Sequence, residues 1–359
     1  MNNKDNKNED VKDEQELDDL FDNLKKNKLN KAIKKAKRHS ILRNVLISFV
    51  VLVVVFIGGS IANRSLVYKL ETPIQIAVSA FNEISAPNEY IGKMDRYHGI
   101  LGGNNSFTTY KIIEGKVVYT GESEYSYGLF QDYYGNRIGT ESPSIIGTSY
   151  DTEDLDRQKY NELGQREMIF FYPYIDYYQY KNDLQLLDQI EANKIMEIAL
   201  SFDQAYSMDA VRDKLPDGVT LSWYWIDDSN DEEKEESESI TITHLDDNGE
   251  QKTEKADFSR IRSEKTVYGI KALDASNQRL ENPLQHFIWA LKNGRKYDTR
   301  YKGEFDRLYN NLLGQDGKLT KADIKVFGVV VTGDAESLKG LEGLPFIKAS
   351  SIGVITDKF

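Results

Sequence analysis

The chain has 359 residues, with 46 Lys and Arg against 58 Asp and Glu, and a formal net charge of −12. It contains no cysteine, which excludes disulfides and thiol chemistry, and its acidity argues against direct nucleic-acid binding. Residues 1–43 carry twelve basic and nine acidic side chains, a net of +3, so the remainder carries −15. A large acidic part without disulfides must be stabilised by its own core.

The N-terminal 22 residues are polar and acidic, and we expect most of them to be disordered because they can bury little apolar surface. A helical stripe then occurs at spacings i, i+3, i+4 and i+7, formed by Leu17, Leu20, Phe21 and Leu24. An uncovered stripe of this kind binds a partner protein or lies on a membrane. The flanking acids Asp18, Asp19 and Asp22 favour a protein partner, and a frayed acidic tail with incidental leucines is the alternative.

Residues 44–63 contain no charged side chain and are apolar on every face. Twenty residues at about 1.5 Å each match the roughly 30 Å of hydrocarbon in a bilayer, which predicts one transmembrane helix. A cleaved signal peptide is the alternative, but its apolar stretch is usually only about 7–15 residues and follows a short leader.

Charge predicts the orientation of this span. Nine basic residues and no acid lie between position 23 and the span, and only Arg64 and Lys69 are basic between the span and Ile74. The positive-inside rule therefore places the N-terminus in the cytoplasm and the large C-terminal part outside the cell. The basic run next to a span suits attraction to anionic lipid better than nucleic-acid binding.

Gly58 and Ala62 are four residues apart near the outer end of the span. This small-xxx-small spacing predicts close packing against another membrane helix, from a second copy of the chain or from a small membrane protein.

The part after the span has the pattern of an α+β domain with a mainly antiparallel sheet. A helix is expected over 71–85, either as a stalk or as the start of the domain, and a turn over 102–105. Residues 106–130 alternate and are rich in Thr, Tyr and Val, which predicts an antiparallel meander with turns at Glu114-Gly115 and at Gly121. Pro173, in an aromatic stretch, indicates a strand edge or a bend.

Two stretches in the C-terminal half share a strand, helix, strand pattern, at 196–227 and 324–357. The first helix should begin near Ser207 or Asp209 and end before Pro216, and Asp334 should cap the second. Between the two stretches, the sequence predicts a hairpin with Asp247-Asn248-Gly249 at its turn, a strand over 266–273 and a helix over 281–294. The acidic run 227–239 is predicted to be a solvated loop. The pattern indicates an open sheet with helices on one face.

No catalytic motif occurs, and the four histidines form no pair with ligand spacing. The sequence therefore predicts no enzyme activity, no metal site and no cofactor. It predicts four parts along the chain, at residues 1–43, 44–63, 64–185 and 186–359.

Several stretches resemble a known family: "KKAKRHSILRNVLISFVVLVVVFIGG" near the N-terminus, and "LSWYWID" and the pair "GVVVTG" and "ASSIGV" in the C-terminal half. The sequence is similar to membrane-bound anti-sigma factors of Gram-positive bacteria that carry sigma factor regulator N-terminal and C-terminal domains. The resemblance implies that the cytoplasmic segment sequesters an extracytoplasmic-function sigma factor and that the outer domain releases it in response to an envelope signal. A bitopic surface protein that binds the cell wall or scaffolds envelope assembly is the alternative.

The resemblance provides no catalytic residues to carry over. The cytoplasmic segment is only about forty residues long and has no cysteine, so it lacks the ligands of the zinc site found in larger anti-sigma domains. If the chain is such an anti-sigma factor, the stripe from Leu17 to Leu24 is the best candidate for the sigma contact.

Overall fold

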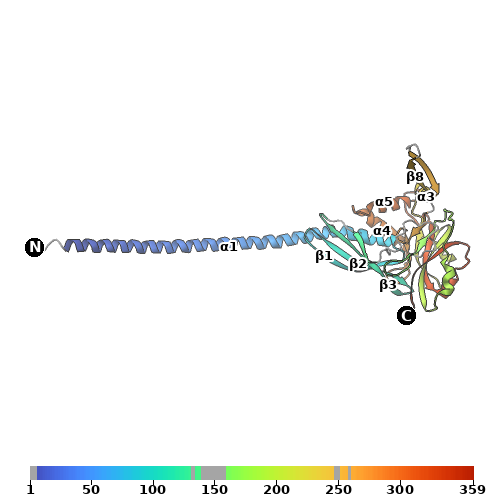
Figure 1. The fold of residues 1–359 in the computed structure, drawn as a ribbon, viewed down its shortest axis with the longest axis horizontal. Coiled ribbons are helices and arrows are strands. Elements are labelled where there is room, and N and C mark those ends of the chain that lie inside the picture. Colours follow the sequence, from blue (N-terminus) through green and yellow to red (C-terminus); the bar gives the residue numbers. More distant parts are fainter. Residues whose placement is uncertain (1–5, 131–133, 139–158, 246–250, 258–259) are drawn as a thin grey trace. The chain divides into compact units, whose positions relative to one another are not determined.

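The computed structural model describes residues 6–130, 134–138, 159–245, 251–257 and 260–359. The chain divides into two compact units, Met1–Ser65 and Leu66–Phe359, hereafter unit 1 and unit 2. One helix, α1 (Asn6–Ser85), forms the described part of unit 1 and continues into unit 2 (Figure 1). The predicted single apolar helix and the α+β class of the rest are both confirmed.

The acidic N-terminal stretch is helical from Asn6 onward, so the predicted disorder over most of it was wrong. Its Glu, Lys and Gln residues have good intrinsic helix propensity. A helix that is already nucleated downstream also gains one hydrogen bond for each residue added to it. The prediction treated this segment as isolated and so overestimated the cost of ordering it.

The end of α1, from Leu66 onward, belongs to the core of unit 2. Val67, Val78 and Ile84 are at most 3% exposed and pack in its main hydrophobic cluster. Of the two predicted roles for the helix over 71–85, the structure therefore supports the start of the domain.

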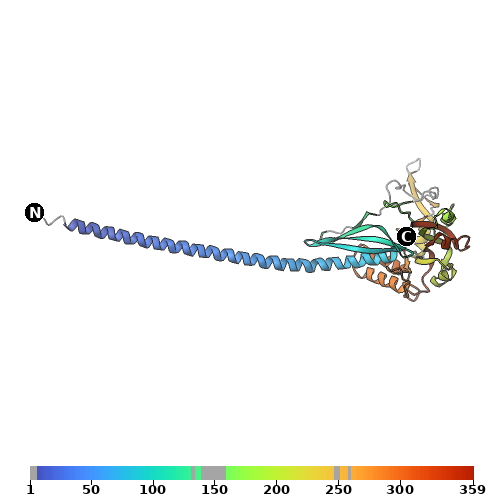
Figure 2. The ribbon, with the colours of Figure 1, turned by 90° about the horizontal axis from the view of Figure 1, so that it is seen from below.

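A four-stranded antiparallel sheet follows α1, in the order β1-β2-β3-β4. Its strands are β1 (Glu89–His98), β2 (Gly102–Ile113), β3 (Lys116–Gly128) and β4 (Tyr134–Ile138). Glu114 and Gly115, both with positive φ, form the turn between β2 and β3, as predicted. The predicted turn at Gly121 was wrong, because Gly121 lies within β3 at a shift in the pairing register. In both ribbon views the teal strands run beside the light-blue end of α1 (Figures 1 and 2).

The predicted turn over 102–105 was wrong, because these residues form the start of β2. A side chain on Gly102 would collide with the carbonyl oxygen of Tyr127, so this glycine serves close strand packing. The turn itself lies at Ile100 and Leu101, where Gly99 donates a 2.7 Å hydrogen bond to the carbonyl of Gly102.

The second sheet has five antiparallel strands in the order β11-β7-β12-β6-β13. Its strands are β6 (Lys194–Tyr206), β7 (Thr220–Ile226), β11 (Gly269–Lys271), β12 (Val326–Asp334) and β13 (Ile347–Asp357). The two predicted strand, helix, strand units are confirmed. Ser207 caps α2 (Met208–Lys214), and Asp334 caps α6 (Ala335–Lys339), each by accepting a hydrogen bond from a backbone N–H in the first turn.

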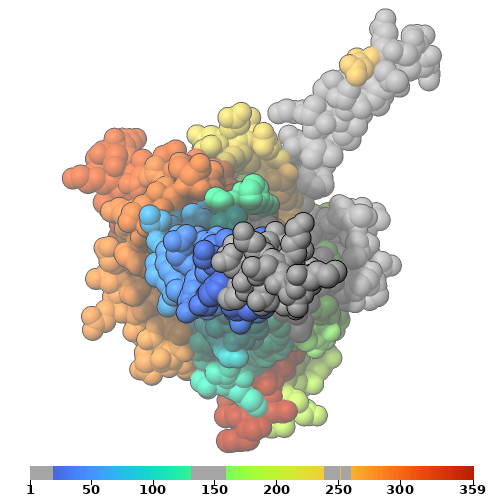
Figure 3. Space-filling model, turned by 90° about the vertical axis from the view of Figure 1, so that its left-hand side faces the viewer, coloured from blue at the N-terminus to red at the C-terminus, as the bar shows by residue number. Residues whose placement is uncertain are grey.

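The two faces of this sheet are covered differently. On one face, Ile198 and Val331 pack with residues of α1, α2, α6 and the helices α4 (Pro283–Lys296) and α5 (Lys302–Asn311). On the other face, Ala199 and Trp223 pack with the aromatic segment 168–177. Helices therefore cover one face, as predicted, and the orange surface of α4 and α5 lies at the left in Figure 3.

The remaining elements are short. They comprise β5 (Ile169–Phe170), which pairs with β10 (Arg262–Ser263), the 3₁₀ helix η3 (Asp183–Gln189) and the hairpin β8 (Ser239–Leu245) with β9 (Gln251–Asp257). A turn begins at Pro173, which confirms the predicted bend. The predicted hairpin turn at 247–249 lies outside the described residues.

The acidic run 227–239 is not simply a loop, because it contains helix α3 (Asp231–Glu238). Asn230 Oδ1 accepts a 2.9 Å hydrogen bond from the Glu233 N–H, and Glu233 Oε2 accepts one of 3.1 Å from the Asn230 N–H. This reciprocal capping satisfies two free N–H groups at the helix start, where acidic side chains are also favoured. The prediction weighed only the charge of the segment and missed its cap.

Candidate functional site

The predicted sigma-contact stripe lies on α1 in unit 1. Leu20, Phe21 and Leu24 are 62%, 57% and 49% exposed, and their spacing places them on one side of the helix. The side chain of Leu17 lies outside those described. Asp19 and Asp22 flank the stripe and are also exposed. Three large apolar side chains in this state provide a surface that a partner protein can bury.

The predicted span lies farther along the same helix. In the described chain, α1 is the one helix long and apolar enough to cross a membrane, and none of its most apolar window is buried. Gly58 and Ala62 are both exposed, and a side chain added at Gly58 would meet no atom within 4 Å. The position is therefore open to an approaching helix.

In unit 2, a buried carboxylate ties α1 to the first sheet. The Glu71 side chain is 3% exposed, and its Oε1 accepts a 2.8 Å hydrogen bond from Nδ2 of Asn105 on β2. Its Oε2 lies 3.1 Å from Nε2 of His98, and Arg96 Nε lies 3.5 Å from Oε1, both on β1. Asn105 also donates a 2.9 Å hydrogen bond to the hydroxyl of Tyr125 on β3. The carboxylate therefore connects the helix to three strands.

A second buried charged cluster links the two sheets. Lys111 Nζ on β2 lies 2.6 Å from Glu197 Oε1 on β6 and 2.9 Å from Glu264 Oε2. Glu197 also accepts hydrogen bonds from Asn88 Nδ2 at 3.2 Å and from the Val354 N–H at 3.2 Å. One ammonium group therefore faces two carboxylates in a site that is almost closed to water.

These surroundings change the protonation of the cluster. Burial raises the pKa of Glu264 to about 7, since the lowering by Lys111 is smaller and the nearby Glu197 adds to the rise. Burial alone would lower the pKa of Lys111, but Glu197 and Glu264 hold it above its ordinary value. Lys111 therefore stays charged, and Glu264 is the member of the cluster that titrates near neutral pH.

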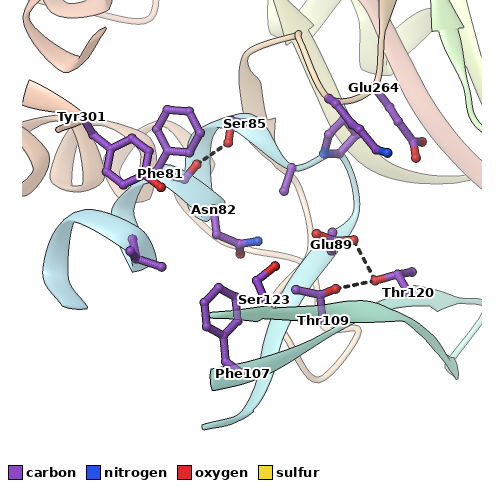
Figure 4. Close-up of a pocket in the computed structure, with 14 residues that line it drawn as sticks. Phe81, Asn82, Ser85, Glu89, Phe107, Thr109, Thr120, Ser123, Glu264 and Tyr301 are labelled. Carbon is purple, nitrogen blue, oxygen red and sulfur yellow. Dashed lines mark hydrogen bonds between the residues drawn. The ribbon is translucent and has the colours of Figure 1, made fainter. Parts of the chain in front are cut away.

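A cavity of about 230 Å³ lies between the end of α1, strands β2 and β3, and the Glu264-Lys265 segment (Figure 4). Its apolar wall includes Phe81 and Tyr301, whose rings stack with centroids 4.5 Å apart. On the polar wall, Thr120 Oγ1 donates a 2.7 Å hydrogen bond to Glu89 Oε2 and lies 2.9 Å from Thr109 Oγ1. These polar groups therefore already bond to one another.

The described part of unit 2 provides no arrangement of nucleophile, base and orienting group in this cavity. Among the described residues, no group of three or more His, Cys, Asp or Glu side chains could hold a metal ion. The Glu71 and Lys111 clusters couple the helix and the two sheets structurally.

Sequence reasoning missed both buried clusters, although one left a signal. Glu71 occupies a position in the apolar series 67, 71, 74, 78, 81, whose spacing marks one face of a helix. An acid within such a face must be buried and paired. Lys111, Glu197 and Glu264 meet only through the tertiary fold, and no local pattern connects them.

Two family models match the chain. The model described as sigma factor regulator N-terminal matches residues 30–118, and the one described as sigma factor regulator C-terminal matches residues 187–354. Neither the curated proteins nor the solved structures searched contain a match. The first match includes the candidate span, strands β1 and β2 and the first residues of β3, and the second includes most of the five-stranded sheet. Together they take in most of the chain, which therefore belongs to the sigma factor regulators, a regulatory rather than enzymatic family, and has an anti-sigma role.

Proposed function

We propose that the protein holds an extracytoplasmic-function sigma factor at the cytoplasmic face of the membrane and releases it when unit 2, on the outer face, senses a change in the envelope. The observation that carries this proposal is the pair of family matches on a chain whose described part has one candidate span, the first match running from residue 30 through that span. On this view the protein is not an enzyme, needs no cofactor and makes no direct contact with nucleic acid.

The charge asymmetry around the span supports an N-terminus in the cytoplasm. Nine basic residues and no acid lie between position 23 and the span, and two basic residues follow it before Ile74. The proposed parts are a cytoplasmic segment (1–43), a span (44–63), a membrane-proximal outer part (64–185) and a C-terminal sensor domain (186–359).

The proposed sigma contact is the stripe formed by Leu17, Leu20, Phe21 and Leu24. Burying each of these side chains contributes about 1.5–3 kcal/mol. Because this stretch is already helical in α1, it avoids much of the roughly 2–5 kcal/mol that ordering a flexible segment costs, which leaves several kcal/mol to set against the entropy of association. The aspartates beside the stripe would steer the segment toward a basic surface of the sigma factor.

The Glu71 cluster provides a route between unit 2 and the span. Glu71 is eight residues beyond Asn63 on the same helix, and it bonds to strands β1 and β2. A rearrangement of the first sheet would therefore act directly on the helix that leads into the membrane. Gly58 and Ala62 would then allow a second copy or a small membrane protein to take part in the response.

The test is to isolate the full-length protein from its membrane and to measure the sigma factor that accompanies it. The double variant Leu20→Asp, Phe21→Asp should lose the sigma factor and switch on its regulon, with unchanged abundance in the membrane. Ile33→Asp is the matched control, because Ile33 is 53% exposed and lies about half a helical circumference from the stripe.

Each outcome has a distinct meaning. Loss of the sigma factor from the Ile33→Asp variant alone would move the contact into the basic segment 25–43. If no sigma factor accompanies the wild-type protein, the anti-sigma mechanism fails, and wall binding or envelope scaffolding becomes the better account of unit 2.

A further inference from the structure

Large apolar side chains are exposed at one end of the first sheet in unit 2. Ile100 is 90% exposed and Phe130 is 88% exposed, with Leu129 at 51% and Leu101 at 39%. We call these four residues the apolar tip. Isolated apolar residues on a surface are ordinary, but four large ones at a single loop cluster indicate an interaction surface.

The members of the apolar tip lie side by side. Gly102 on β2 pairs with Gly128 on β3, so the β1–β2 turn and the residues after β3 occur at the same end of the sheet. The Leu129 N–H donates a 3.1 Å hydrogen bond to the carbonyl of Leu101. The backbone therefore holds Ile100 and Leu101 next to Leu129 and Phe130.

The turn at the apolar tip is made of residues that are unusual for a turn exposed to water. Leu101 has φ +60°, in the left-handed region that turns usually fill with Gly, Asn or Asp. A branched side chain is strained there, and both Ile100 and Leu101 would be better replaced by polar residues if the tip faced solvent. Strain maintained at an exposed apolar turn points to a function for these side chains.

The position of the apolar tip in unit 2 indicates what it can contact. Strand β1 ends at His98, whose ring packs edge-on against Tyr68 of α1 at 5.2 Å and bonds to Glu71. The tip therefore lies at the end of unit 2 where the chain enters from Ser65. Tyr68 follows Asn63, the last residue of the uncharged segment, by five residues, or about 7.5 Å of helix.

Two exposed tyrosines occur at the same end, Tyr68 at 41% and Tyr97 at 63% exposure. Tyrosine is enriched where proteins meet the headgroup region, because its ring is apolar and its hydroxyl is polar. Apolar side chains at the tip with tyrosines just behind them match the order of environments from the acyl chains outward to water.

We propose that the apolar tip inserts into the lipid bilayer, in the leaflet on the side of unit 2, so that a lipid surface is its partner. This anchors the first sheet to the membrane at a point separate from the span. The proposal rests on residues 44–63 being a span, but on neither the orientation of the chain nor the identity of the sigma factor.

The absence of cysteine allows a direct test with single-cysteine variants of the full-length protein. Ile100→Cys is labelled with an environment-sensitive fluorophore, and the protein is reconstituted into vesicles containing phospholipids with spin-labelled acyl chains. Val117→Cys is the matched control, because Val117 is 62% exposed and lies at the opposite end of the same sheet. We expect several-fold stronger quenching and a blue-shifted emission at position 100.

Equal quenching at positions 100 and 117 would overturn the proposal. A label at position 100 that is shielded from water, is not quenched by the lipids and cross-links to another chain would overturn it in favour of a second copy. A label on Val51→Cys, within the predicted span, reports whether the span is inserted in the bilayer. If this label is not quenched, both the predicted span and the tip proposal fail. Loss of sigma binding, in contrast, would contradict neither the span nor the tip proposal.

Discussion

Asn105 donates a 2.8 Å hydrogen bond from Nδ2 to Oε1 of Glu71, a carboxylate that is 3% exposed and 34 residues away in the sequence. The bond joins α1, shortly after the candidate span, to the second strand of the first sheet. Because a buried carboxylate without partners is costly, the helix cannot turn or slide against this strand without a large penalty.

Removing the partner should therefore destabilise unit 2. We expect Asn105→Leu to lower the free energy of unfolding by about 1–3 kcal/mol, because one oxygen of the buried carboxylate loses its amide donor while His98 and Arg96 still face the group. Glu71→Gln should cost less, since the amide keeps an acceptor for Asn105. Thermal unfolding of the full-length protein in detergent, followed by circular dichroism in the near-ultraviolet, measures both. If Glu71→Gln costs as much as Asn105→Leu, the prediction is wrong, and the charge of Glu71 matters as much as the hydrogen bond that it accepts from Asn105.

The orientation of the span is a separate prediction. A protease added to intact protoplasts should digest residues beyond Arg64 and leave the N-terminal segment protected, because the nine basic residues before the span hold that end inside. Epitope tags at the two ends report the fragments. A protected C-terminus would reverse the orientation and remove the proposed sigma contact from the cytoplasm.

Gly58 allows a clean test of helix packing in the membrane. A side chain at Gly58 or at Gly59 meets no atom within 4 Å in the chain itself, so Gly58→Leu and Gly59→Leu are equally tolerable in the single helix. Gly58 has the four-residue spacing to Ala62, whereas Gly59 points about 100° around the helix from Gly58 and does not complete that spacing. We expect Gly58→Leu to reduce self-association or partner binding in a membrane two-hybrid assay and Gly59→Leu to leave it in place. Identical behaviour of the two variants would contradict packing through this face.

The acidic residues beside the stripe should act through long-range attraction. Asp18→Asn with Asp19→Asn should weaken sigma binding less than Leu20→Asp does, and mainly through a slower association rate. Ionic strength of about 0.1 M already screens charges beyond roughly 10 Å, so the defect should shrink as salt is added. Surface plasmon resonance at several salt concentrations measures this, and a defect independent of salt would argue for a direct contact instead.

Much of the fold could be predicted because its signals are local. Ser207 and Asp334 each cap the first turn of the helix that directly follows them, and the turn at Glu114-Gly115 is formed within four consecutive residues. Helix α3 was missed because its signal is a pair, Asn230 and Glu233, hidden in a run of like charges. The meander and the paired strand, helix, strand units needed no knowledge of distant contacts.

The candidate sites also differ in whether a local sequence pattern reveals them. The stripe and the Gly58 position come from periodicity along one helix, so the sequence alone suggests them. Lys111 meets Glu197 and Glu264 across 86 and 153 residues, and this depends on which strands become neighbours in the two sheets. The strand order β11-β7-β12-β6-β13 has no local determinant, and therefore the charged cluster it helps to build could not be predicted.

The charged cluster makes a prediction about pH. The pKa of Glu264 is raised from 4.5 to about 7 in the folded protein, so the folded state binds this proton more tightly than the unfolded state. Its contribution to the free energy of unfolding is complete below the unfolded pKa and is lost as pH rises to about 7, where Glu264 becomes ionised. The substitution Glu264→Gln places a neutral amide beside Lys111, which imitates the protonated carboxyl at every pH.

The measurement compares the melting temperature of the wild type with that of Glu264→Gln in the same detergent at several pH values. The difference, variant minus wild type, should grow between about pH 4.5 and pH 7 and level off above that, because in this window the wild type loses the stabilisation that its tightly bound proton provides. Using the difference cancels the titration of all other groups that the two proteins share. A difference that stays constant over this range would mean that Glu264 is ionised throughout, and that Lys111 neutralises both carboxylates without help from a proton.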